Sequence, residues 1–191
     1  MGFLFWASDN LLFIPWNLPV KLSIYAKDRY SVVFPVLIKC PCCNSAVKLK
    51  RHGFYERNAL ANKRCYRISI CRYLCPACLK TVSLLPWFLL PYFQHNRNAI
   101  LKSLRESFRK TTAAVGRQLA AFYHKRFLAN TPAIVSALRE QHWRERLPAD
   151  KNKGAIKIVR RLNFTRASET TLAEVNSLSN RILANFMARS F

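Results

Sequence analysis

Two Cys-x-x-Cys turns contain the residues of this chain best suited to chemistry. One turn offers Cys40, Cys42 and Cys43, and the other offers Cys75 and Cys78. Zn²⁺ in structural sites takes four ligands in a tetrahedron, and two such turns together supply enough thiolates. Cys42 and Cys43 are adjacent, but a gap of two residues lets both thiolates of a turn face one ion, which favours Cys43. We therefore predict a structural Zn²⁺ held by Cys40, Cys43, Cys75 and Cys78.

The remaining cysteines allow weaker interpretations. Cys65 and Cys71 are six residues apart, so on a strand they would share a face and could form a second, partial metal set. Small buried thiols are the favoured interpretation, because free cysteine behaves as a small apolar residue. A dithiol redox centre is disfavoured, since nothing around either turn resembles a thioredoxin-like setting. We assign no catalytic role to His52 or His95.

The two turns need strands to bring them together. A strand is expected over Val47–Arg57, followed by turn-forming residues over 58–63. Apolar and polar residues then alternate towards Leu74, which is typical of a half-buried strand. A third strand is expected over Thr81–Leu85. Residues 39–95 are thus predicted to form a small antiparallel zinc ribbon.

Helical periodicity begins after the ribbon, over residues 96–147. A first helix is expected from Asn96, and a second is expected to be capped by Thr112. Thr131 and Pro132 suit the start of a third helix, with Thr as N-cap and Pro at the first helical position. Three short helices in a basic context suggest a helix-turn-helix unit, although a generic bundle fits the pattern equally well. The expected inner faces are Ile100, Leu101, Leu104 and Phe108; Val115, Leu119 and Phe122; and Ile134, Val135, Leu138, His142 and Trp143.

Two terminal segments flank these parts, and the whole is predicted to be an α+β protein. Residues 1–38 are apolar and aromatic, with short extended pieces expected at Lys21–Tyr25 and Ser31–Phe34. This segment suits docking to a protein partner, and an interfacial membrane role is a weaker alternative. Residues 148–191 are interpreted as a basic linker over 148–154, a short basic strand or helix over Ala155–Arg166 and a final helix over Thr171–Arg189.

The net charge points to a polyanionic partner. Lys and Arg number 32 against nine Asp and Glu, which gives +23, far more than solubility requires. Basic residues neutralise phosphates, and the aromatic residues between them can stack on bases. If the third helix entered a major groove, Arg139 and Gln141 would be its base readers. The predicted nucleic-acid contacts are Lys50, Arg51, Arg57, Arg64, Arg67, Arg72, Arg117, Lys125, Arg126, Arg139 and Arg144.

Several classes of protein fit the sequence poorly. Two-metal nucleases and transposases need converging carboxylates, and the nine acidic residues here are scattered. No run reaches the roughly 18 apolar residues of a membrane span. The odd number of cysteines, seven, and an apolar start without a basic flank argue against a secreted disulfide scaffold. We expect a non-enzymatic protein of the reducing cytoplasm, near the nucleoid if the source is bacterial.

Four stretches of sequence carry a family resemblance. They are Lys39–Cys43, Arg51–Tyr55, Tyr73–Cys78 and Leu84–Tyr92, the last reading Leu-Leu-Pro-Trp-Phe-Leu-Leu-Pro-Tyr. Over about residues 38–145 the chain resembles uncharacterised bacterial zinc-ribbon and helix-turn-helix proteins related to insertion-sequence transposases. The resemblance implies zinc at Cys40, Cys43, Cys75 and Cys78 and DNA as the partner. We expect this DNA to be double-stranded, and the scattered acidic residues lead us to expect no catalytic domain of the chain's own. The extra cysteines, the aromatic N-terminal segment and the long connection before Thr131 depart from the family pattern.

Two other functions remain open from the sequence. A zinc-ribbon protein that binds RNA or the ribosome would use the same charge and the same rings. A protein-interaction module would dock a partner through residues 1–38 together with Trp87 and Phe88.

Overall fold

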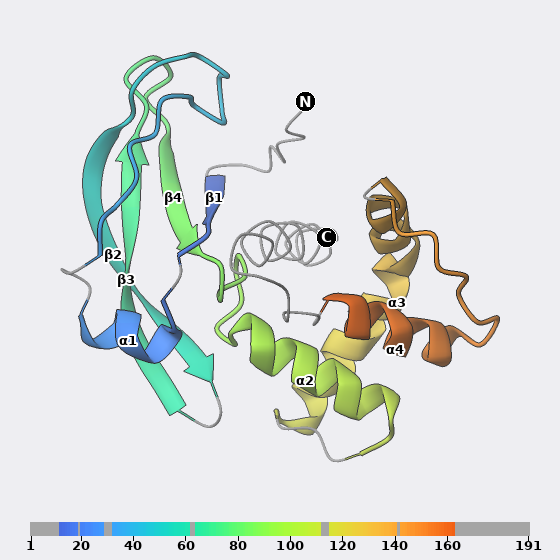
Figure 1. The fold of residues 1–191 in the computed structure, drawn as a ribbon. Helices are drawn as coiled ribbons and strands as arrows, with labels where there is room; N and C mark the ends of the chain where they lie inside the picture. The colour runs from blue at the N-terminus through green and yellow to red at the C-terminus, as the bar shows by residue number, and fades with distance from the viewer. Residues whose placement is uncertain are drawn as a thin grey trace. The chain divides into compact units, whose positions relative to one another are not determined.

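The fold is described from a computed structural model for residues 12–18, 20–28, 32–61, 64–111, 115–140 and 142–162 (Figure 1). Two compact units make up the chain. The first comprises residues up to Ala59 together with Cys65–Trp87, and the second comprises Leu60–Arg64 and the residues from Phe88 onward. Four strands and four helices in this described part confirm the α+β class.

A four-stranded sheet with the order β1-β4-β3-β2 is the framework of the first unit. The long strands β2 (Lys50–Ala61) and β3 (Arg64–Leu74) are neighbours, and β3 runs antiparallel to β4 (Thr81–Pro86). The predicted turn over residues 58–63 is wrong in part, because β2 continues to Ala61. Ala59 is fully buried in this part of β2, so its place in the sheet is decided by burial and not by the local turn signal.

The N-terminal part differs from the sequence prediction. Leu12–Trp16 forms strand β1, which pairs parallel with β4. Pro15 is tolerated because β1 is an edge strand, where the ladder does not need every N–H. Lys21–Tyr25, predicted to be extended, lies mostly in helix α1 (Leu22–Lys27). Helical spacing lets Leu22 and Tyr25 be buried on one side, and the Tyr25 hydroxyl donates to the Ser69 carbonyl at 2.6 Å.

An irregular segment, residues 32–49, packs on one face of the sheet. Phe34 and Leu49 of this segment join Cys71 and Tyr73 of β3 in one cluster, whereas Val36 and Ile38 are exposed. The Tyr73 hydroxyl donates to the Pro35 carbonyl at 2.7 Å, which fixes the segment to the strand. The predicted strand from Val47 therefore begins later, at Lys50. These contacts with β3 position the first Cys-x-x-Cys turn.

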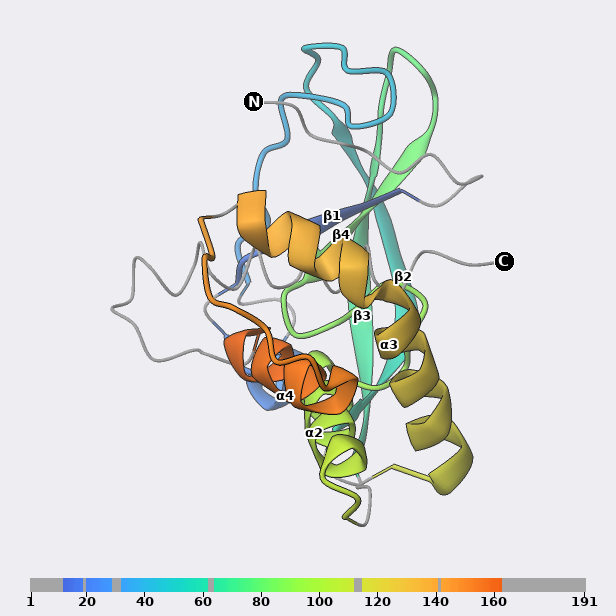
Figure 2. The same ribbon diagram turned by 90° about the vertical axis from the view of Figure 1, so that its right-hand side faces the viewer.

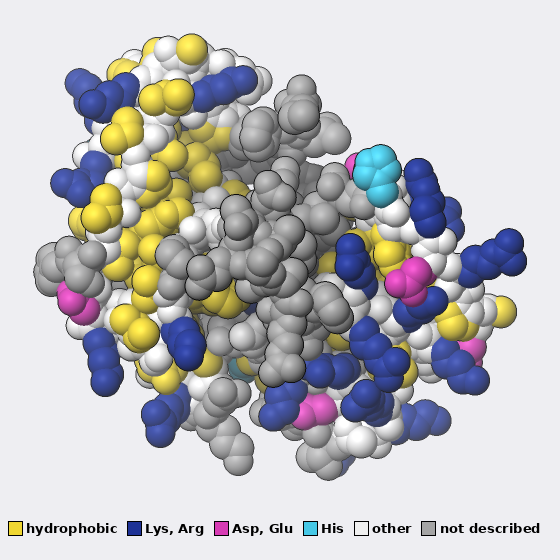
Figure 3. All heavy atoms as spheres, in the orientation of Figure 1, with side chains coloured by type: hydrophobic (Ala, Val, Ile, Leu, Met, Phe, Trp, Pro, Cys, Tyr) yellow, Lys and Arg dark blue, Asp and Glu magenta, His cyan; other side chains and the backbone are white. Residues whose placement is uncertain are grey.

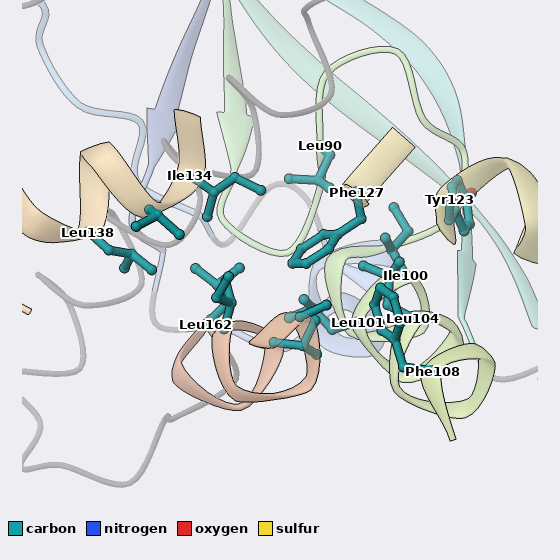
Figure 4. Packing of buried hydrophobic residues seen from close by; sticks show 14 of the residues in the cluster. Leu90, Ile100, Leu101, Leu104, Phe108, Tyr123, Phe127, Ile134, Leu138 and Leu162 are labelled. Carbon is teal, nitrogen blue, oxygen red and sulfur yellow. The ribbon is translucent and has the colours of Figure 1, made fainter. Parts of the chain in front are cut away.

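Helices α2 (Arg97–Phe108), α3 (Arg117–Glu140) and α4 (Lys151–Leu162) form the core of the second unit. The Asn96 side chain caps α2 by accepting from the Ala99 N–H at 2.8 Å. Figure 4 shows how the apolar side chains of the three helices meet, with Phe127 near the middle. Phe108 and Phe127 pack edge to face, with ring centroids 5.7 Å apart. The expected inner face of the first helix is buried.

A single long helix replaces the two helices expected around Thr131. α3 runs through Pro132, so the predicted helix start at Thr131 is wrong. The Thr131 hydroxyl donates back to the Phe127 carbonyl at 2.9 Å instead of capping a new helix. Pro132 lacks an N–H, and α3 bends within its length, as Figure 2 shows. Ile134 joins Phe127 in the core cluster, and its burial offsets the free energy that the helix loses through the missing hydrogen bond at Pro132.

The inner face expected for the second helix is also partly wrong. Phe122 is 45% exposed, whereas Tyr123 and Phe127 are buried. Val115 is buried but precedes the helix, and His142 is exposed while Trp143 is buried. The proposed cap Thr112 and the proposed base reader Gln141 lie outside the described residues, as does the final helix over 171–189.

Helix α4 begins inside the segment that the sequence predicted as a linker. Asp150 is its N-cap, since the Asp150 carboxylate accepts from the Lys153 N–H at 2.7 Å. Gly154 is buried within the helix, where an added Cβ would lie 3.6 Å from the Pro148 carbonyl oxygen. The sequence favoured a linker because glycine and charge are typical of loops, whereas apolar burial from Ala155 onward decides for the helix.

Gly154→Ala is expected to raise the free energy of unfolding by about 0.5–1 kcal/mol, because alanine favours the helix and restricts the unfolded chain. The new methyl group would meet only an ordinary van der Waals contact. Thermal unfolding monitored by circular dichroism measures the change. Gly53→Ala is the opposite control, since its φ of 116° strains any L side chain. Destabilisation by Gly154→Ala would contradict the helical placement.

None of the helices in the described ranges is both long and apolar enough to span a bilayer.

Candidate metal centre and basic surfaces

The two Cys-x-x-Cys turns have the same backbone geometry. In the first turn, the Asn44 N–H donates to the Cys40 carbonyl at 3.0 Å, and Asn44 has a φ of 59°. In the second turn, the Leu79 N–H donates to the Cys75 carbonyl at 2.9 Å, and Leu79 has a φ of 56°. A left-handed residue after the second cysteine closes each turn so that both thiols point to the same side. The chain leaving each turn is also hydrogen-bonded to the first cysteine. The Cys40 N–H donates to the Ser45 carbonyl, and the Cys75 N–H donates to the Lys80 carbonyl, both at 3.0 Å.

Four sulfur atoms gather where the turns meet. The Sγ atoms of Cys40, Cys43, Cys75 and Cys78 all lie within 4.8 Å of one another. Two distances between the turns, Cys40 Sγ to Cys78 Sγ and Cys43 Sγ to Cys75 Sγ, are 3.8 Å. A tetrahedral ion with metal–sulfur bonds of about 2.3 Å places its ligands about 3.8 Å apart, whereas a disulfide needs about 2.05 Å. The spacing therefore fits four ligands of one metal ion.

The pKa values of three of the four thiols are shifted from the ordinary value. Burial raises the pKa of Cys40, and hydrogen bonds with Ser45 lower the pKa of the exposed Cys43 to about 6. The Lys80 amide favours the thiolate of Cys78, but burial and the three neighbouring thiols raise its pKa to about 12. Thiolates this close repel one another, so a positive charge among them would favour their ionised form. Bound metal supplies that charge and makes ligand binding release protons.

The other three cysteines lie outside this set. Cys42 is half-buried, and its N–H donates to Cys40 Sγ at 3.3 Å, a backbone contact that supports the neighbouring ligand. Cys71 is buried in the apolar cluster, while Cys65 is exposed. Within the described ranges, the one group of metal-ligating side chains close enough to share an ion is the set of four.

The predicted basic contacts of the hairpin differ in exposure. Lys50, Arg51 and Arg64 are exposed, and Arg67 is 77% exposed while its Nε lies 3.7 Å from a carboxylate oxygen of Glu56. Two others are half-buried. Arg72 donates to the Thr81 hydroxyl at 3.1 Å, and burial lowers the pKa of Arg57. The hairpin therefore offers four accessible cations, and the half-buried two have structural contacts.

The predicted contacts in the helical unit are mostly on the surface of α3. Arg117, Lys125 and Arg139 are exposed, and so is Arg144 beyond the helix. Arg126 is half-buried and lies over the Phe122 ring, 5.7 Å from its centroid. Figure 3 shows Lys and Arg side chains spread over the surface with few acidic ones between them. Because α3 is one helix, Arg139 is at the end of a long helix and not on a separate reader helix.

Sequence reasoning missed a further set of cations on α4. Lys151, Lys153, Arg160 and Arg161 are exposed on this helix, which carries no acidic residue. Lys151 and Lys153 fell in the predicted linker, whereas Arg160 and Arg161 fell in the short basic strand or helix expected over Ala155–Arg166, which the structure shows to be helical as far as Leu162.

A family model described as "Domain of unknown function (DUF6431)" matches residues 40–121. The matched stretch begins at Cys40 and contains all four clustered cysteines, strands β2 to β4 and helix α2. It covers less than half of the chain. No curated protein and no solved structure gives a significant match. The helix α4 and its cations lie outside the matched stretch.

Leu79→Gly is expected to stabilise the second turn by about 0.5–1 kcal/mol, because a leucine with positive φ is strained and glycine is not. The Leu79 side chain is 74% exposed, so its removal sacrifices little packing. Chemical denaturation of the metal-loaded protein measures the change. Asn44→Gly is the matched control in the other turn and should be nearly neutral, since asparagine tolerates this conformation. Equal gains in both variants would contradict the argument.

Proposed function

We propose that this chain is a DNA-binding protein in which a structural Zn²⁺ holds a basic hairpin in shape. The observation that carries the proposal is the cluster of four Sγ atoms, within 4.8 Å of one another, beside the sheet that presents Lys50, Arg51 and Arg67. Four cysteine ligands and no open position are typical of structural zinc, not of catalytic zinc. In this proposal the metal performs no reaction, and the basic residues bind the DNA.

Charge supports nucleic acid as the partner. A net charge of +23 produces a strong, salt-dependent attraction to phosphates. Phe54 is 47% exposed and places an aromatic ring among the cations of the hairpin. Its ring packs edge to face on Phe34, with the ring centroids 5.4 Å apart. The resemblance to proteins related to insertion-sequence transposases adds duplex DNA as the favoured class. A protein of this design would recognise DNA without cutting it.

A competition assay tests the proposal. The metal-loaded protein is bound to a labelled DNA duplex of mixed sequence at about 100 mM salt, and unlabelled duplex or structured RNA is added. We expect duplex DNA to compete better and the logarithm of affinity to fall linearly with the logarithm of salt concentration. The triple variant Lys50→Gln, Arg51→Gln, Arg67→Gln should bind at least about tenfold more weakly and show a salt slope smaller by about 2.7.

The alternatives predict different results. Better competition by structured RNA would replace the proposal with RNA binding. Absence of any salt-dependent affinity for either nucleic acid would overturn it and favour a protein-interaction module. Metal analysis that finds no zinc, or no loss of binding on chelation, would remove the structural role of the ion.

A further inference from the structure

Helix α4 has two opposite faces. Its buried residues, Gly154, Ala155, Ile158, Val159 and Leu162, join the core of the helical unit. On the other side lie Lys153, Lys157, Arg160 and Arg161, which we call the basic stripe. Their spacing of i, i+4, i+7 and i+8 places them along one face of a helix. From the first to the last, the stripe covers about 12 Å of helix axis.

The helix is fixed at both ends, so the stripe is presented by a rigid element. Asp150 caps the N-terminus through the Lys153 N–H. At the other end, the buried Arg97 of α2 donates from Nη2 to the Leu162 carbonyl at 2.7 Å. Lys157 connects α4 to the preceding segment, since its Nζ lies 2.9 Å from Glu145 Oε2 and donates to the Arg146 carbonyl. Lys153 and Arg160 have no ion pair with a carboxylate in the described part of the chain.

The chemistry of the stripe favours duplex DNA. The major groove of B-DNA is about 12 Å wide and admits one α-helix, whereas the major groove of an RNA duplex is too deep and narrow for side chains to read. Single-stranded nucleic acid is recognised by stacking on aromatic rings. α4 carries no aromatic residue, so it offers cations without a stacking surface. An acidic protein surface could also attract these cations, but it would not necessarily offer a groove of the width of one helix, as duplex DNA does.

We propose that α4 inserts into the major groove of duplex DNA, with Lys153, Arg160 and Arg161 contacting the phosphates that border it. This inference rests on the proposed DNA-binding function and adds the element that enters the groove. It places the groove-binding helix after α3, not at residues 131–143 where the sequence suggested it.

Two triple variants that remove equal charge from the metal-loaded full chain test the inference. The stripe variant is Lys153→Gln, Arg160→Gln, Arg161→Gln. The control variant is Lys102→Gln, Arg109→Gln, Lys110→Gln, whose exposed cations lie on α2 and just after it. Affinity for a mixed-sequence DNA duplex is measured over a range of salt concentrations. All six residues are exposed, so circular dichroism should show the same fold and thermal midpoint in both variants.

We expect the stripe variant to bind at least about tenfold more weakly than the wild type, with a salt slope smaller by about 2.7. The control variant should change affinity less than about threefold. Equal losses in both variants would show that binding follows total charge and would overturn the role of α4, while the proposed function would stand. A stripe variant that binds like the wild type would overturn it as well. A wild type that binds no duplex would instead refute the proposed function itself.

Discussion

Cys75→Ser is expected to abolish stoichiometric metal binding and to unfold the first unit. The Cys75 side chain is fully buried, and its Sγ lies 3.8 Å from Cys43 Sγ across the two turns. Serine is a poor ligand for zinc, and the remaining three thiols cannot close the tetrahedron. Since metal binding free energy is folding free energy in such sites, the loss should exceed about 4 kcal/mol. Metal analysis of the purified protein and denaturant unfolding measure both effects.

The control for this prediction is Cys65→Ser. Cys65 is exposed on β3 and lies outside the four-sulfur set, so the variant should keep one metal ion per chain and wild-type stability. Chelation of the wild type should reproduce the Cys75→Ser result. Loss of metal in both serine variants, or retention in both, would contradict the assigned ligands.

Much of the metal site was predictable because its ligands are local. A Cys-x-x-Cys turn brings its two thiols together through hydrogen bonds within five residues, such as Asn44 N–H to the Cys40 carbonyl. Only the meeting of the two turns depends on distant residues. The second turn lies between β3 and β4, and the first belongs to segment 32–49, which the Tyr73 hydroxyl joins to β3 by donating to the Pro35 carbonyl. The strand β1 was missed because its stability comes from pairing with β4, about 70 residues later in the chain. The local sequence of Leu12–Trp16 gives no information about this pairing with β4.

Errors in the helical unit have a different cause. Thr131 and Pro132 together form a strong local start signal, yet tertiary burial of residues on both sides keeps α3 continuous. Thr131 satisfies its hydroxyl within the helix, which a sequence pattern cannot distinguish from capping. Gly154 misled in the same way, because its place in α4 is decided by the core. The predicted nucleic-acid contacts include no residue of α4.

Phe127→Ala is expected to lower the free energy of unfolding of the helical unit by about 3–5 kcal/mol, because it opens a cavity in the core. The ring is fully buried and packs against Phe108. A loss of this size is a large part of the free energy of unfolding of an ordinary domain. Denaturant unfolding followed by circular dichroism at a helix-sensitive wavelength measures it. The metal content should stay unchanged, since the four cysteines belong to the other unit.

Phe122→Ala is the matched control, because it removes the same ring from the same helix at a position that is 45% exposed. Phe122→Ala should lower the free energy of unfolding by less than about 1 kcal/mol. This loss includes the cation–π contact with Arg126, whose Cζ lies 5.7 Å from the centroid of the Phe122 ring. The sequence pattern alone assigned Phe122 to the inner face, so the pair of variants decides between that face and the face seen here. A greater loss in Phe122→Ala than in Phe127→Ala would mean that α3 is rotated about its axis. In that case Lys125 and Arg126, which flank the buried Phe127, would also change their exposure.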